Sequence, residues 1–128
     1  MILGIDLGQK TTGLATSDSS LATPYKTISH KSIDEATDKI GKICDQLMVD
    51  KIVIGFVEGE IKSYFQKFVK NFKTKKPNIE VVMWDETLTS RQARNWMIKQ
   101  QVPKTKRKLK EHEIAASLIL QSYLDENA

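Results

Sequence analysis

Short runs that are apolar, or in which apolar and polar residues weakly alternate, dominate the first third of the chain. They cover Ile2–Leu7, residues 13–17 after a polar turn, and residues 25–29. Alternation of this kind, interrupted by Gly, Asp and Ser, is typical of strands joined as hairpins. We therefore expect the chain to begin with three antiparallel strands.

Beyond residue 34 the apolar residues are spaced by three and four, which predicts helices that alternate with strands. Ser32 or Asp34 is the candidate N-cap of the first helix. The apolar face of that helix comprises Ala36, Ile40, Ile43 and Leu47. The β-branched run Lys51–Phe56 is typical of a buried parallel strand, and residues 79–84 predict another strand after Pro77.

Three further helices are expected in the remaining segments. The second helix has a stripe of core residues, namely Ile61, Tyr64, Phe65, Phe68, Val69 and Phe72. Thr87 or Thr89 can cap a third helix that runs to about residue 100, and a last helix is expected over residues 114–124 after a basic loop around Pro103. The whole order predicts an α/β fold with a mixed five-stranded sheet, three antiparallel strands followed by two parallel ones, flanked by helices on both faces.

Composition limits the class of protein. The 128 residues fit one domain, residues 1–128, and a hydrophobic fraction of 40% with 28% charged residues excludes disorder as the main state. No apolar run approaches the length of a membrane span, and the single Cys44 suits a reducing cytoplasm. We expect a cytoplasmic protein with no membrane partner.

The net charge of +4 favours a polyanionic partner such as nucleic acid. The positive charge is concentrated in one segment without acidic residues. Its basic side chains are Lys99, Lys104, Lys106, Arg107, Lys108 and Lys110. We expect this segment to contact phosphates, although a solvated turn would have the same composition.

Acidic residues occur at three places where catalytic groups are often found. Asp6 ends the first strand, Glu86 follows the strand 79–84 together with Asp85, and the segment 111–113 (Glu-His-Glu) opens the last helix. Each has a structural alternative, because a carboxylate also stabilises a turn or a helix N-terminus. Together they suit Mg²⁺ or Mn²⁺, and two such ions about 4 Å apart can drive phosphodiester hydrolysis.

Other chemistries fit the sequence less well. Cys44 lies on the apolar face of a predicted helix, where a core residue is expected rather than a nucleophile. His30 and His112 with one cysteine make no zinc motif, and the chain has neither a Walker phosphate loop nor a dinucleotide fingerprint. The glycine-bounded turn at residues 8–13 could approach a phosphate, which is a weak signal on its own.

Three segments taken together resemble the YqgF/RuvX family of bacterial RNase H-like proteins. They are ILGIDLGQKTTGLATSD at the start, DETLTSRQAR in the middle and EIAASLILQSYLD at the end. The resemblance implies an RNase H-like fold, a metal-dependent nuclease, and trimming of the 5′ end of precursor 16S ribosomal RNA. Members of the family have also been described as Holliday junction resolvases.

The resemblance also implies roles for individual residues. Asp6 matches a first-strand aspartate proposed to bridge two metal ions, and Glu86 matches the glutamate of a DERLT-like segment. The positions matched to substrate contacts are Thr11, Thr12, Arg91 and Arg94. Where the family has an aspartate opening the last helix, this chain has His112 followed by Glu113, so either residue could complete the catalytic set.

Two consequences follow from the differences. An imidazole ligand at His112 would favour Mn²⁺ over Mg²⁺. The segment FVEGEIKS at residues 56–63 replaces a longer proline-bearing loop of the family, which leaves the substrate open.

The leading expectation is therefore an endonuclease for structured RNA such as precursor rRNA. The alternatives are a resolvase of four-way DNA junctions and a catalytically silent nucleic-acid-binding protein. A resolvase would need a dimer and RNA trimming would not, so the oligomeric state stays open between a monomer and a weak dimer.

Overall fold

The protein is described here from a computed structural model that covers residues 1–57, 59, 61–86 and 104–127, the side chains of 104–109 excepted. Its strands are β1 (Ile2–Leu7), β2 (Thr11–Ser17), β3 (Thr23–Ser29), β4 (Lys51–Phe56) and β5 (Glu80–Asp85). They form one five-stranded sheet in the order β3-β2-β1-β4-β5. The β1–β2 and β2–β3 pairs are antiparallel, and the β1–β4 and β4–β5 pairs are parallel. The predicted mixed sheet is confirmed.

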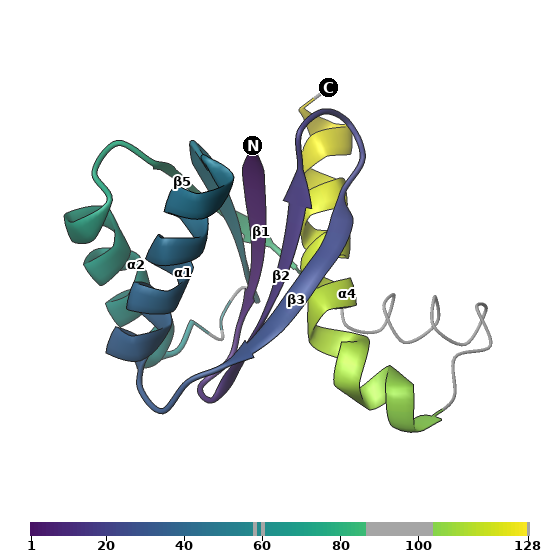
Figure 1. Cartoon of the computed structure of the whole chain (residues 1–128), viewed down its shortest axis with the longest axis horizontal. Helices are drawn as coiled ribbons and strands as arrows, with labels where there is room; N and C mark the ends of the chain where they lie inside the picture. The colour runs from purple at the N-terminus through teal and green to yellow at the C-terminus, as the bar shows by residue number, and fades with distance from the viewer. Residues whose placement is uncertain (58, 60, 87–103, 128) are drawn as a thin grey trace.

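Helices cover both faces of this sheet (Figure 1). On one face lie α1 (Ile33–Leu47) and α2 (Ser63–Lys75), and α4 (Lys104–Glu126) crosses the other. Each of the parallel connections described here passes through a helix on the α1/α2 side, as a parallel crossover requires. Among the described residues, no helix is long and apolar enough to cross a membrane.

Local sequence accounts for the ends of α1 and α2. Ser32 caps α1, since its hydroxyl accepts a hydrogen bond from the Glu35 amide at 3.1 Å. The helix ends at Met48, which adopts a left-handed conformation with φ 56°. α2 ends two residues before Pro77, as the sequence predicts.

Two apolar clusters flank the sheet. The larger lies between the sheet and the pair α1/α2, and its largest fully buried members are Leu3, Ile5, Leu14, Ile40, Ile52, Ile54, Phe68 and Phe72. Cys44 belongs to this cluster, and burial raises the pKa of its thiol to about 12, so it is a core residue as expected. The smaller cluster joins the other face to α4 and includes Ala15, Val53, Ile119 and Leu120.

Glycines on the second face let α4 approach the sheet very closely. A Cβ atom at Gly4 would lie 2.8 Å from Leu120 Cβ, and one at Gly13 would lie 2.0 Å from the His112 carbonyl oxygen. Neither distance is sterically possible for a side chain. The backbone of α4 around His112 is therefore in direct contact with β2.

The last helix is longer than predicted. It begins at Lys104 rather than at Ile114, so the basic segment predicted as a loop after Pro103 forms its first turns instead. The reason is local: residues 104–113 contain no Gly or Pro and consist mainly of strong helix formers, so the helix extends toward the N-terminus. The helix predicted from Thr87 or Thr89 to residue 100 lies outside the described residues.

Candidate active site

The two carboxylates predicted from the sequence lie at one edge of the sheet. Asp6 is the penultimate residue of β1 and pairs with Gly13 of β2. Glu86 directly follows β5. Because β1, β4 and β5 are parallel, their carboxyl ends share this edge. The Glu86 amide donates to the Phe56 carbonyl oxygen at 2.7 Å, which fixes the chain at the end of β5 against β4.

Gly55 makes room for the Glu86 side chain. A Cβ atom at Gly55 would lie 2.7 Å from Glu86 Oε2 and 2.5 Å from Ile119 Cδ1. The carboxylate is thus folded over β4, in contact with the sheet and close to α4. A larger residue at position 55 would push Glu86 out of this place.

The environment of Glu86 opposes its ionisation. Burial, and after it the Asp6 carboxylate and Asp85, raise the pKa of Glu86 from 4.5 to about 7. Its Oε2 atom is buried and has no hydrogen-bond partner among the described residues. Two close carboxylates with an unpartnered buried oxygen favour either a bound proton or a cation.

His112 brings the third predicted group to the same place. Its Nδ1 lies 3.6 Å from Asp6 Oδ2, and its Nε2 lies 3.4 Å from the Thr11 hydroxyl. The Asp6 carboxylate raises the pKa of His112, and Glu111 adds to this effect. The charged imidazole is thereby favoured next to Asp6.

Glu113 points elsewhere. Its Oε2 accepts a hydrogen bond of 3.5 Å from the Thr27 hydroxyl on β3. Of the two residues that could complete the set, the structure therefore brings His112 to Asp6. Glu113 is correspondingly the weaker candidate for a catalytic role.

The donor set suits a divalent cation by its chemistry. Carboxylates are ligands of Mg²⁺ and Mn²⁺, and the unpartnered buried oxygen of Glu86 is available for an ion. As they stand, however, no three His, Cys, Asp or Glu side chains in the described part of the chain converge closely enough to form a metal site. The fit to a metal thus rests on Asp6 and Glu86, with His112 as a neighbour.

Thr11 and Thr12, both predicted to contact substrate, lie on opposite faces of the sheet. Thr11 is partly exposed beside His112. Thr12 is fully buried, and its hydroxyl lies 2.8 Å from His30 Nε2. The prediction for Thr12 is wrong, because its side chain shares the core face of β2 with Leu14 and does not reach the surface.

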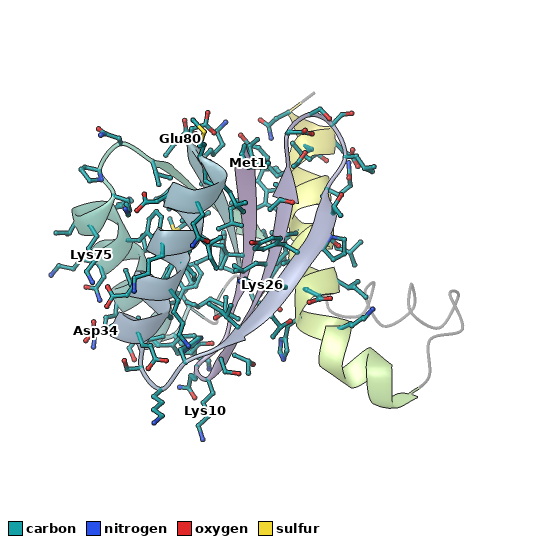
Figure 2. The ribbon with its side chains drawn as sticks, viewed as in Figure 1. Met1, Lys10, Lys26, Asp34, Lys75 and Glu80 are labelled. Atoms are coloured by element: carbon teal, nitrogen blue, oxygen red, sulfur yellow. The ribbon has the colours of Figure 1, made fainter. Side chains whose placement is uncertain are left out.

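The predicted phosphate contacts are only partly visible. Lys104, Lys106, Arg107 and Lys108 lie in the first turns of α4, and their side chains are not described. Arg91 and Arg94 lie outside the described residues. At the same edge of the sheet, Lys10 is exposed at the tip of the β1–β2 hairpin, opposite Met1 and Glu80 at the other edge (Figure 2).

Tyr64 is a neighbour of the site that the sequence did not reveal as such. It lines a cavity of about 140 Å³ together with Leu7, Lys62 and Glu86. Burial, and then the charges of Asp6 and Glu86, raise the pKa of its hydroxyl. The sequence assigned Tyr64 to the core stripe of α2; the available signal was its hydroxyl, which a buried tyrosine places near polar groups.

Comparison with solved structures defines the class of fold. Thermus thermophilus RuvC in complex with a Holliday junction substrate superposes with a TM-score of 0.61 at 10% identity, covering 98% of this chain and 94% of that chain. The Fowlpox virus resolvase bound to Holliday junction DNA gives 0.61 at 16% identity, covering 98% and 97%. The fold is thus that of the RuvC-like, RNase H-like resolvases.

Comparison of the sequence then identifies the family. The model of the family described as "RuvX: Holliday junction resolvase" matches residues 1–126, and the chain belongs to this family. A Clostridium botulinum (strain Hall) protein named "Putative pre-16S rRNA nuclease" is 38% identical over 131 residues, covering 97% of this chain and 96% of that one. The resemblance seen in the sequence is confirmed, and these relatives and the fold support the prediction of a hydrolase that acts on nucleic acid.

Proposed function

We propose that the protein is a divalent-metal-dependent endonuclease that processes the 5′ end of precursor 16S rRNA. Membership of the RuvX family and the name of the Clostridium botulinum relative support this substrate. The single observation that carries the chemistry is the pair Asp6 and Glu86 at one sheet edge, in which the pKa of Glu86 rises to about 7. We further infer that residues 1–128 act as one domain in the cytoplasm.

Each group at the edge has a distinct part in this proposal. Asp6 and Glu86 would hold Mg²⁺ or Mn²⁺, with His112 as the third candidate ligand, and a pair of such ions would supply an activated water and charge stabilisation. Thr11 holds the His112 imidazole through their 3.4 Å contact, which orients the ring toward Asp6. The basic first turns of α4 would bind the phosphate backbone on either side of the cleaved bond.

The proposal is tested with Asp6→Asn, which keeps the shape of the side chain and removes its charge. We expect this variant to bind precursor rRNA as well as wild type does and to lose metal-dependent cleavage. The matched control is Asp18→Asn, because Asp18 is exposed just beyond the far end of β2. Equal cleavage by Asp6→Asn and wild type would remove Asp6 from the mechanism.

A second candidate function is the resolution of four-way DNA junctions. The description of the family model favours it. Two symmetric cuts in one junction require two active sites, so this function predicts a dimer, whereas rRNA trimming is compatible with a monomer. Rates measured side by side on a synthetic junction and on precursor rRNA, with light scattering of the protein, decide between them.

A third candidate is a catalytically silent binding protein, and His112 favours it. A protonated imidazole 3.6 Å from Asp6 supplies the positive charge that an ion would otherwise supply. Titration with Mn²⁺ separates the two cases, because a bound ion broadens the nuclear resonances of residues around Asp6 and Glu86. A spectrum that Mn²⁺ leaves unchanged favours the silent protein.

A further inference from the structure

His30 is a buried titratable residue with no part in the chemistry described so far. It follows β3 and is 4% exposed. Burial lowers the pKa of its imidazole, which is therefore neutral at physiological pH. A neutral buried imidazole is a hydrogen-bonding group with fixed neighbours, so its contacts indicate what it does.

Its backbone amide and its Nε2 atom both contact the β1–β2 hairpin. The His30 amide donates to the Lys10 carbonyl oxygen at 2.9 Å, and His30 Nε2 lies 2.8 Å from the Thr12 hydroxyl. The Thr12 oxygen in turn accepts a hydrogen bond from the Gly8 amide at 3.4 Å. His30 thus holds the hairpin turn at its tip through Lys10, at its end through Thr12, and at its start through the contact of Thr12 with Gly8.

The turn held in this way connects the groups of the candidate active site. Gly8 lies two residues after Asp6, and Thr11 is the residue before Thr12. Because side chains alternate along a strand, Thr12 points to His30 on the α1 side while Thr11 points to His112 on the α4 side. A shift of Thr12 therefore moves Thr11 and the chain that follows Asp6 together.

We propose that His30 is a positioning residue: with Thr12 and the Gly8 amide it forms a clamp beneath the hairpin that sets the place of Asp6, Thr11 and His112. The inference rests on the proposed nuclease function for its kinetic consequence. The clamp acts from the opposite face of the sheet, and His30 does not contact the reacting atoms.

The test begins with Thr12→Val, which keeps the shape of the side chain and removes the hydroxyl, against Thr12→Ser, which keeps the hydroxyl. The matched control is Thr37→Val, because Thr37 is equally buried and its hydroxyl donates to the Ile33 carbonyl oxygen at 2.8 Å within α1. We expect Thr12→Val to lower kcat by at least ~10-fold at unchanged KM, since a 1 Å misplacement alone can cost ~10²-fold. Thr12→Ser and Thr37→Val should keep wild-type kcat.

A second pair of variants tests His30 itself. His30→Gln can place a polar atom near Thr12, whereas His30→Met fills a similar volume without one. We expect His30→Met to lower kcat as Thr12→Val does, and His30→Gln to retain most of the wild-type kcat. In the double variant, His30→Met should lower kcat no further than Thr12→Val alone does, because both changes break the same contact.

Two readouts are independent of cleavage: hydrogen exchange of the Gly8 amide and the side-chain resonances of His112. Both should change in Thr12→Val and in His30→Met, and neither should change in Thr37→Val. Unchanged exchange of Gly8, or a kcat of Thr12→Val equal to that of Thr37→Val, overturns the clamp. If the wild-type protein cuts no substrate, the nuclease function is refuted but the clamp is not. Hydrogen exchange of Gly8 and the His112 resonances then test the clamp without any measurement of cleavage.

Discussion

The raised pKa of Glu86 predicts that this carboxylate destabilises the folded protein when no cation is bound. Between pH 4.5, its ordinary value, and about 7, the folded state keeps a proton that the unfolded state has released. The folded state then binds more protons, so the free energy of unfolding falls as pH rises through this window and stays low above it. Replacement by glutamine removes the buried charge and should abolish the fall.

The magnitude follows from the size of the rise. Each pKa unit corresponds to about 1.36 kcal/mol. The rise of the Glu86 pKa from 4.5 to about 7 therefore lowers the free energy of unfolding by roughly 3 kcal/mol at most. Glu86 is only partly buried, so solvent screens part of this effect, and we expect Glu86→Gln to gain ~1–2 kcal/mol over wild type at pH 8. The gain should shrink toward pH 5.

The assay is urea unfolding of wild type and Glu86→Gln in the presence of a chelator, at several pH values between 5 and 8. Glu126→Gln serves as the control, since Glu126 is an exposed carboxylate at the far end of α4. A second series with Mg²⁺ or Mn²⁺ in place of the chelator should stabilise wild type and leave Glu86→Gln unchanged. If Glu86→Gln and Glu126→Gln show the same pH dependence, the burial argument for Glu86 is refuted.

Three further changes follow from the geometry. Gly13→Ala should lower the free energy of unfolding by ~1–3 kcal/mol because its Cβ would overlap the His112 carbonyl, while Gly41→Ala, which meets only a flexible lysine, should not; equal urea midpoints would contradict this. His112→Asp should raise the ratio of Mg²⁺-supported to Mn²⁺-supported cleavage, because imidazole suits Mn²⁺ better, and an unchanged ratio argues against ligation by His112. The joint replacement by alanine of the basic residues in the first turns of α4 should weaken RNA binding. It should also make the binding constant less dependent on salt concentration, by the equivalent of up to about three phosphate contacts. An unaltered salt dependence would exclude these residues from the interface. Those residues are Lys106, Arg107 and Lys108.

The strands and the first two helices could be predicted because their hydrophobic periods are clear. Lys51–Phe56 was predicted with the bounds that the structure has, since a β-branched run between polar residues has few alternatives. The start of α4 could not be found in the same way, because residues 104–113 lack an apolar period and only their helix propensity indicates a helix.

The face on which Thr12 lies could have been predicted. A strand alternates its side chains, so Thr12 must share a face with the fully buried Leu14, and Thr11 must share the other face with Gly13. The resemblance matched both threonines of the hairpin without this distinction. Strand parity separates the two threonines, and the structure then places Thr11 beside His112 and Thr12 in the core.

The meeting of three site residues has two different physical causes. Asp6 and Glu86 come to one edge because the parallel strands end there, and Gly55 on the intervening β4 leaves the space in which the Glu86 side chain lies over that strand. His112 comes close to Asp6 because Gly4, Gly13 and Gly55 place no side chain between the sheet and α4 at their positions. Glycine within a strand indicates, from sequence alone, a turn or a weak strand position. That a helix packs on it depends on a partner far along the chain. The common edge of the two carboxylates therefore depends on strand order and on Gly55, whereas the placement of His112 rather than Glu113 beside Asp6 depends on how α4 packs.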